Sequence, residues 1–193
     1  MNRIAPIHPE NATGATKEHL EGVQKKLGMV PNMMRTMATA PKVLEGYLQL
    51  SGALGGGTLP AKVREQIALT VAQANGCEYC LAAHTAIGGM VGLSAEQIYD
   101  SRVGTAVDSR TNAILMLAHA IVNERGNLDD AQFQAARNAG LDDTAMAEVA
   151  ANVALNVFTN YFNNLARTEV DFPAVAPIEV APTGASNAVG HSR

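Results

Sequence analysis

EQIALTVAQANGCEYCLAAH, residues 65–84, contains the only two cysteines of the chain, together with a histidine and a carboxylate. Cys77 and Cys80 form a C-x-x-C pair. His84 follows the second cysteine by four residues, and Glu65 precedes the first by twelve. The rest of the sequence is typical of a helical scaffold. We therefore take Glu65, Cys77, Cys80 and His84 as the candidate site.

Helix signals lie on both sides of the cysteines. Residues 60–74 predict a helix with proline near its first turn, and Asn75-Gly76 predicts its end, because both residues tolerate the left-handed conformation of a C-terminal cap. A second helix is predicted to begin near Cys77. At 3.6 residues per turn, the two cysteines and the histidine, at i, i+3 and i+7, share one face of this second helix.

The short turn between these two helices predicts that they run antiparallel. At about 1.5 Å per residue, Glu65 then lies about 14 Å back from the turn and His84 about 11 Å beyond it. We therefore expect a carboxylate, an imidazole and the thiol of Cys80 in one line. Glu65 also has the apolar residues Ala68 and Leu69 at i+3 and i+4, so its side chain is expected to point inward and to need a partner.

The same residues allow other interpretations. Two free cysteines can simply be buried in a core, and His84 can be a satisfied core histidine. A structural zinc site of Cys77, Cys80, His84 and Glu65 is chemically feasible, although zinc sites of the C-x-x-C type usually have a second Cys/His pair. Haem attachment through C-x-x-C-H is excluded, because Leu81 follows the second cysteine.

The pattern E-x11-C-x-x-C-x3-H resembles the active-site signature of alkylhydroperoxidase D, within the carboxymuconolactone decarboxylase-like superfamily. Three segments resemble the peroxidase-related branch of that superfamily: VPNMMRTMATAP from Val30, LPAKVREQIALTVAQANGCEYCLAAHT from Leu59 and NYFNNLARTEVDFP from Asn160. The resemblance covers most of residues 30–173, and it is specific, because the decarboxylases themselves generally lack the paired cysteines. One departure is Tyr79, which stands where alkylhydroperoxidase D has a histidine between its cysteines.

The resemblance implies an all-α, single-domain helical bundle of about seven to nine helices over residues 1–172. It implies a thiol-dependent peroxidase in which Cys80 attacks the hydroperoxide and becomes a sulfenic acid, Cys77 condenses with it to a disulfide, and an external dithiol reduces the pair. Glu65 and His84 act in this mechanism as a proton relay. No cofactor and no metal are implied, and the expected assembly is a homotrimer or homohexamer.

The residues by themselves leave the roles of the two cysteines open. Cys77 is nearer the N-terminus of its predicted helix, whose partial positive charge favours a thiolate there. Cys80 lies one turn from His84, which favours the assignment that the resemblance implies. A disulfide oxidoreductase or redox sensor would use the same pair without a peroxide. A decarboxylase-like enzyme would instead use Glu65 and His84 as its acid and base.

Composition restricts the other classes of protein. Of 193 residues, 47% are hydrophobic and 4% aromatic, with no tryptophan, which favours closely packed helices over a β-sandwich. The net charge of -4 comes without a basic cluster, so nucleic acid and anionic membranes are poor partners. The first residues lack the apolar core of a signal peptide, and no segment reaches the roughly 18 apolar residues of a membrane span. We therefore expect a soluble, cytoplasmic protein.

An asparagine row follows the last predicted helix, residues 142–167. Its members lie at i+4 spacing in an otherwise apolar sequence: Asn152, Asn156, Asn160 and Asn164. The row is either a solvated face or a hydrogen-bonded contact with another helix, which can belong to a second subunit.

Two further segments complete the predictions. Met33, Met34 and Met37 cluster in one short predicted helix, where they either fill the core or line a hydrophobic substrate channel. From Pro173 onward, small residues and prolines cannot build a core of their own, so residues 173–193 are expected to form an extended or disordered arm.

Overall fold

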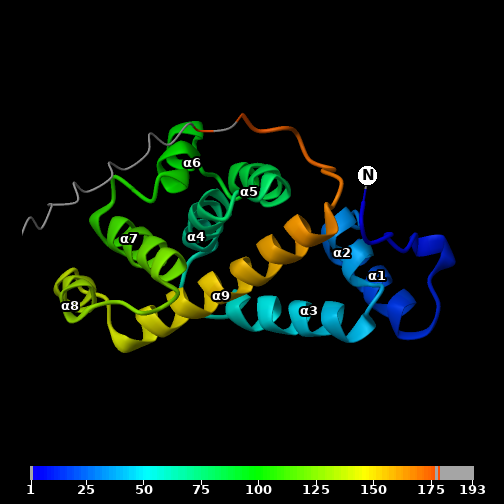
Figure 1. Cartoon of the computed structure of the whole chain (residues 1–193), viewed down its shortest axis with the longest axis horizontal. Helices are drawn as coiled ribbons and strands as arrows, with labels where there is room; N and C mark the ends of the chain where they lie inside the picture. Colours follow the sequence, from blue (N-terminus) through cyan, green and yellow to red (C-terminus); the bar gives the residue numbers. More distant parts are fainter. Residues whose placement is uncertain (1, 177, 179–193) are drawn as a thin grey trace, which may run out of the picture.

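Figure 1 shows the computed structural model, which describes residues 2–176 and residue 178. This part of the chain contains nine α-helices, one short 3-10 helix and no strand. The helices are η1 (Pro9–Asn11), α1 (Gly14–Leu27), α2 (Asn32–Met37), α3 (Pro41–Gly55), α4 (Ala61–Ala74), α5 (Glu78–Met90), α6 (Ala95–Arg102), α7 (Ser109–Glu124), α8 (Asp130–Asn138) and α9 (Asp143–Ala166). None of these helices is long and apolar enough to cross a membrane. The all-α prediction is therefore confirmed.

The longest helix, α9, runs through the middle of the molecule and supports its neighbours (Figure 1). It packs against α3, α4, α5 and α7, and α4 in turn packs against α5, α6 and α7. The side chain of Asp142 caps the start of α9 by accepting a hydrogen bond from the N–H of Ala145. Arg167, in the left-handed conformation, ends the helix. Most of the bundle is thus organised by contacts with α4 and α9.

Two clusters of buried side chains lie between the helices. The first, which we call the methionine core, consists of Ala12, Leu20, Val23, Val30, Met33, Met34, Met37, Ala38, Leu44, Ala72, Cys77, Tyr79, Cys80, Leu81 and Ala83. The second, which we call the aliphatic core, consists of Leu59, Val63, Ile67, Val71, Ala113, Ile114, Leu115, Leu117, Ala118, Ala136, Leu141, Ala145, Val149 and Val153. Both cysteines belong to the first cluster.

The α4–α5 hairpin has the boundaries predicted from its sequence. Pro60 directly precedes α4, and Asn75 is the C-terminal cap of that helix. The turn needs a positive φ at Gly76, 59°, which glycine adopts without strain. Cys77 is the N-terminal cap of α5, so the C-x-x-C pair occupies the first turn of the helix, as expected.

The asparagine row on α9 lies mostly inside the bundle. Asn152, Asn156 and Asn160 are buried, whereas Asn164 is exposed. The interpretation as a solvated face is therefore wrong for the first three, because this face of α9 is covered by other helices of the same chain. Asn75 donates to Oδ1 of Asn160 (3.0 Å), and Asn164 donates to the carbonyl of Asn75 (3.1 Å). The expected hydrogen-bonded contact with another helix thus forms at the end of α4.

The chain beyond α9 leads into the predicted C-terminal arm. In Figure 1 this segment passes above α5 toward α6, and the guanidinium of Arg102 donates to the carbonyl of Ala176 (2.9 Å). The described part of the arm, residues 173–176 and 178, contains no helix. The prediction for residues 177 and 179–193 lies outside the described residues.

Candidate active site

The antiparallel packing of α4 and α5 brings Glu65 and His84 together. Nδ1 of His84 lies 2.7 Å from Oε2 of Glu65, and the two side chains are 22% and 18% exposed, respectively. Because a carboxylate accepts hydrogen bonds, Nδ1 of the imidazole carries the hydrogen, and Nε2 is left for a second partner. The two residues are therefore level with each other, as helix geometry predicted, and Glu65 has the partner that it was expected to need.

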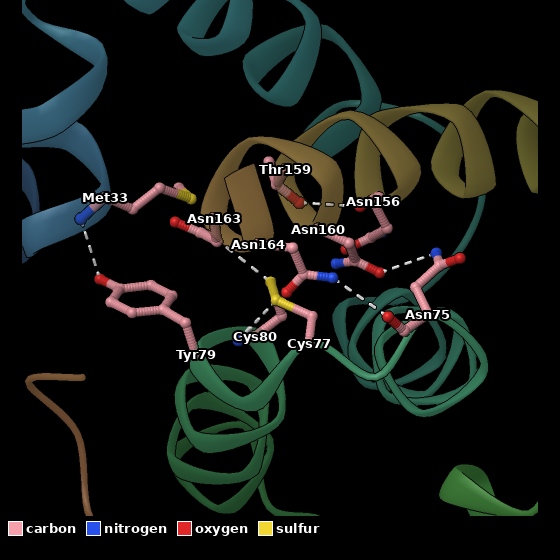
Figure 2. Close-up of a disulfide and its surroundings, with 10 residues drawn as sticks. All are labelled: Met33, Asn75, Cys77, Tyr79, Cys80, Asn156, Thr159, Asn160, Asn163 and Asn164. Atoms are coloured by element: carbon pink, nitrogen blue, oxygen red, sulfur yellow. Dashed lines mark hydrogen bonds between the residues drawn. A yellow bond between two sulfur atoms is a disulfide. The ribbon is translucent and has the colours of Figure 1, made fainter. Parts of the chain in front are cut away.

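The two cysteines form a disulfide at the first turn of α5 (Figure 2). Their Cα atoms are 5.3 Å apart. The N–H of Cys80 donates to Sγ of Cys77 (3.2 Å), so the first cysteine caps the helix with its sulfur. The interpretation as two free core cysteines is therefore wrong. After reduction both sulfurs would lie in the partial positive charge of a helix N-terminus, which favours thiolates.

A cavity of about 490 Å³ borders this first turn. Cys80, His84 and Glu65 all lie in its wall, whereas Cys77 does not. Much of the rest of the wall is apolar and comes from Val23, Leu27, Met33, Met34, Leu48, Leu54, Ala68, Ile87, Leu155 and Phe172. The structure therefore places one of the two cysteines, together with the imidazole–carboxylate pair, beside a space large enough for a small organic molecule.

The three methionines of α2 were expected either to fill the core or to line a hydrophobic channel, and the structure shows both. All three are buried in the methionine core. Met33 and Met34 also line the cavity, whereas Met37 does not. Core packing and cavity lining are thus combined, because this core directly borders the cavity.

Tyr79, between the cysteines, anchors the first turn of α5 to α2. Its hydroxyl oxygen accepts a hydrogen bond from the N–H of Met33 (3.2 Å), and its ring meets that of Phe172 edge-on at 5.8 Å between centroids. Burial, with a smaller contribution from the carboxylate of Asp171, raises the pKa of Tyr79 above its ordinary value. The position therefore holds a neutral hydroxyl at physiological pH, where alkylhydroperoxidase D has a histidine.

Tyr47, on α3, is a second tyrosine in the cavity wall. Burial and the nearby charge of Glu65 raise the pKa of Tyr47 to about 12. A phenol of this kind stays protonated at neutral pH, so it can donate a hydrogen bond but cannot accept a proton there.

Asn163, which was not predicted as a site residue, contacts the disulfide from α9. Its Nδ2 donates to Sγ of Cys80 (3.3 Å; Figure 2), and its side chain is buried. Asn163 is 83 residues from Cys80 and lies outside the i+4 row, so no spacing connects the two. The sequence signal that could have indicated this residue was the Asn163-Asn164 pair, which lies in the segment from Asn160 that resembles the peroxidase-related branch.

The four candidate residues form two pairs. One is the Cys77–Cys80 disulfide, and the other is the contact between Glu65 and His84. Within residues 2–176 and 178, no three His, Cys, Asp or Glu side chains are arranged to hold a metal ion. Sulfurs joined in a disulfide are not thiolates, which are the form that binds zinc. This arrangement gives the zinc-site interpretation no support.

Comparison with protein families locates the site within a matched region. The model of the carboxymuconolactone decarboxylase family matches residues 41–120, which contain all four candidate residues. An uncharacterised protein of Haemophilus influenzae is 41% identical over 69 residues, or 35% of this chain and 56% of that protein. The match therefore spans little more than half the length of this relative.

Solved structures match over most of the chain. A peroxidase-related protein with an alkylhydroperoxidase AhpD core, from Ralstonia eutropha JMP134, is 26% identical, with a TM-score of 0.77 over 88% of this chain and 92% of that chain. A peroxidase-related protein from Silicibacter sp. TM1040 is 24% identical, with a TM-score of 0.72 over 86% of each chain.

The debrominase Bmp8 also has this fold, at 21% identity and a TM-score of 0.74 over 88% of this chain and 92% of that chain. At these lower identities the Silicibacter protein and the debrominase show the fold alone. The match to the family model includes the region of the paired cysteines. The chain therefore has the fold of the peroxidase-related protein with an alkylhydroperoxidase AhpD core, and its residues 41–120 match the carboxymuconolactone decarboxylase family.

Proposed function

We propose that this protein is a thiol-dependent peroxidase that reduces organic hydroperoxides through Cys77 and Cys80. One observation carries the proposal: the sulfur-bearing residue Cys80 shares the wall of a cavity of about 490 Å³ with the hydrogen-bonded pair of His84 and Glu65. A nucleophile, a proton acceptor and a carboxylate that orients it therefore meet at one substrate-sized space.

The first step consumes the peroxide at Cys80. Nε2 of His84 accepts the thiol proton, and the charge of Glu65 stabilises the imidazolium through Nδ1. The thiolate then attacks the terminal oxygen of the hydroperoxide, so that an S–O bond forms and the O–O bond breaks. The leaving alkoxide takes the proton from His84 and departs as an alcohol. Cys80 is left as a sulfenic acid, oxidised by two electrons.

The second step closes the disulfide. The thiolate of Cys77 attacks the sulfur of the Cys80 sulfenic acid, an S–S bond forms, and the hydroxide leaves as water after it takes a proton. The Cα separation of 5.3 Å lies in the range that a disulfide accepts. An external dithiol then supplies two electrons and two protons, becomes a disulfide itself, and regenerates both thiols.

Access to the cavity supports Cys80 as the attacking residue. Cys77 is fully buried and does not line the cavity, whereas Cys80 does. Cys77 remains the stronger candidate by position in the helix field alone, because it is the N-terminal cap. We give access the greater weight, since a buried thiolate that cannot meet the peroxide cannot react with it.

The wall of the cavity supports an apolar substrate. Met33, Met34 and Phe172 are among its apolar members, and methionine adapts to chains of different shape. We therefore propose hydroperoxides of alkyl or aryl compounds as substrates, in preference to hydrogen peroxide, which gains nothing from an apolar wall.

Mass spectrometry of the reduced protein after one equivalent of cumene hydroperoxide tests the proposal. The protein should lose the mass of two hydrogens, and peptide mapping should locate the change as a Cys77–Cys80 disulfide. One molecule of cumyl alcohol should form per protein. Continuous consumption of peroxide with dithiothreitol should follow. A protein that exchanges disulfides but leaves the peroxide intact would instead be a disulfide oxidoreductase or redox sensor. An activity that survives substitution of both cysteines by alanine would indicate decarboxylase-like chemistry at Glu65 and His84.

A further inference from the structure

The end of α9 places the amide of Asn163 at a buried sulfur. Its Nδ2 donates to Sγ of Cys80 across 3.3 Å, and both residues are 2% exposed (Figure 2). The backbone of Asn163 is also fixed, because its carbonyl accepts the N–H groups of Arg167 and Thr168 in the C-terminal cap. The backbone that carries the donor is therefore held in place by the end of the helix.

This contact does not complete a structural network. Oδ1 of Asn163 is buried and has no hydrogen-bond partner among the described residues. A buried amide with half of its hydrogen-bonding capacity unmet destabilises a fold relative to an apolar side chain of the same shape. A disulfide sulfur is moreover a weak acceptor. The amide gains most when the sulfur is negatively charged, because hydrogen bonds to an ion are the strong ones.

We propose that Asn163 is a further catalytic residue, whose side-chain amide stabilises the thiolate of Cys80. Its part in turnover rests on the proposed peroxidase function, whereas its effect on ionisation does not. The helix end on which Asn163 lies explains why a hydrogen-bond donor is useful at this sulfur. The last turn of a helix carries partial negative charge, so the end of α9 disfavours an anion at Cys80. The N–H of Asn163 directs the positive end of a dipole at the sulfur.

The amide acts in both halves of the proposed cycle. In the peroxide step, the sulfur uses its electron pair to form the S–O bond and loses its charge, so Asn163 acts by maintaining the supply of thiolate. In the reductive step, two electrons pass from the external dithiol to the sulfur pair, and the amide stabilises the charge that arrives on Cys80. Loss of the amide should therefore also make the disulfide harder to reduce.

Other ionisable groups face the same space. His84 pairs with Glu65, and the remaining ones on the cavity wall are Glu18, His19 and Lys26 of α1, Tyr47 of α3, Arg64 of α4 and Tyr79 of α5. A smaller pocket that Asn163 lines contains Glu78, Arg167 and Glu169. A substitution at position 163 leaves all of these groups in the chain, so a change in the ionisation of Cys80 reports the amide itself.

The test measures alkylation of Cys80 by iodoacetamide from pH 5 to pH 10. It uses a Cys77→Ser background, in which no disulfide can form and the serine oxygen can still cap α5. In this background, Asn163→Leu should lower the alkylation rate at pH 7 about tenfold and move the whole profile to higher pH. The plateau rate at pH 10 should not change, because ionisation is affected and access is not.

Asn164→Leu is the matched control. Asn164 is the next residue on the same helix and donates to the carbonyl of Asn75, so the control removes an asparagine amide without touching the sulfur. Its alkylation profile should coincide with that of the Cys77→Ser parent. Circular dichroism of each variant establishes that the bundle is folded.

A second variant decides the matter if the leucine protein fails to fold. Asn163→Ala removes the amide without adding a charge or bulk, so its profile should also move to higher pH. An unchanged profile in a folded Asn163→Leu or Asn163→Ala protein overturns the inference. Such a result would not contradict the proposed peroxidase function. Conversely, if the protein consumes no peroxide but the amide stabilises the thiolate, the alkylation profile of the variant still moves to higher pH.

Discussion

The methionine core and the aliphatic core differ in what they can accommodate. The methionine core contains three methionines and both cysteines, and several of its members line a cavity of about 490 Å³. The aliphatic core contains only alanine, valine, leucine and isoleucine, and Ile67, Leu115 and Val149 in it are fully buried. Branched side chains pack in defined rotamers, whereas methionine adapts to irregular spaces. The aliphatic core therefore holds the helices together, whereas the methionine core leaves space for a reacting molecule.

The largest effect should follow substitution of a cysteine in the methionine core. Cys80→Ser should abolish peroxide turnover, because it removes the sulfur of the cysteine that lines the cavity. Cys77→Ser should consume about one equivalent and stop with a sulfenic acid on Cys80, because the resolving thiol is missing. Dimedone labelling followed by mass spectrometry locates the sulfenic acid. A label on Cys77 in the Cys80→Ser protein, with none on Cys80 in the Cys77→Ser protein, would reverse the two roles.

Glu65→Gln should slow the reaction of Cys80 with peroxide on the order of 10²-fold, the typical contribution of one acid–base group. Glutamine keeps the size and hydrogen-bonding capacity of Glu65 but removes the charge that stabilises the imidazolium of His84. Folding should remain near native. Stopped-flow peroxide kinetics from pH 6 to pH 9, with thermal unfolding of the same sample, measure both properties.

A positioning role for Glu65 through His84 predicts that the rate profile of the Glu65→Gln protein moves to higher pH. A lower melting temperature with an unchanged rate per folded molecule would instead mean that Glu65 is structural. In that case Glu65 would not belong to the catalytic site beside the methionine core.

Leu115→Ala should affect stability without affecting chemistry. Leu115 is fully buried in the aliphatic core, and such substitutions destabilise proteins by about 2–5 kcal/mol. The rate per folded molecule should stay the same, because the cavity is lined by other residues. Urea unfolding measures the free energy, and circular dichroism under the assay conditions gives the fraction of folded protein. A large loss of rate per folded molecule would show that the two cores are not separable.

The oligomeric state of the protein tests whether a neighbouring subunit completes either core. Phe158, Tyr161 and Leu165 are 39%, 61% and 63% exposed on α9 and lie three and four residues apart, so they share one outward face. We predict a homotrimer or homohexamer that buries this face, and Tyr161→Lys should shift it toward monomer. Sedimentation velocity at micromolar concentration provides the measurement, and a monomeric parent protein would remove this prediction.

The smallest effect concerns alkaline stability near the methionine core. The pKa of Tyr47 is about 12 in the fold, against an ordinary value of 10.0. Between these values the unfolded chain releases a proton that the folded chain keeps, so stability is intact below pH 10 and falls as the pH rises toward 12. The slope for one such proton is at most about 1.4 kcal/mol per pH unit. Tyr47→Phe should flatten this decline in urea unfolding between pH 9 and pH 11, and an equally steep decline would contradict the assignment.

Local helix geometry explains how much of the site could be predicted. Glu65 and His84 belong to one hairpin, so a turn signal and the rise per residue are enough to set them level. Asn163 could not be found in this way, because its contact with Cys80 depends on how α9 packs against a helix more than 80 residues earlier. Spacing on a single helix carries no information about that packing.

The asparagine row shows the same limit on a smaller scale. Its i+4 spacing correctly indicated one face of one helix, but a sequence does not say which face the bundle covers. The structure buries Asn152, Asn156 and Asn160 and leaves Asn164 exposed. The all-α fold could be predicted, because composition and the resemblance both indicated it, whereas the contacts between distant helices needed the structure.

The Cys77–Cys80 bond joins residues that are only three apart in the chain. A ring this small removes little freedom from the unfolded polypeptide, whereas a ring of about 100 residues would stabilise the fold by about 4.7 kcal/mol in the chain-entropy description. The fold therefore depends less on this bond than it would on a disulfide that closes a long loop. Repeated closing and opening of this ring should leave the bundle folded, so each cycle can begin without refolding of the protein.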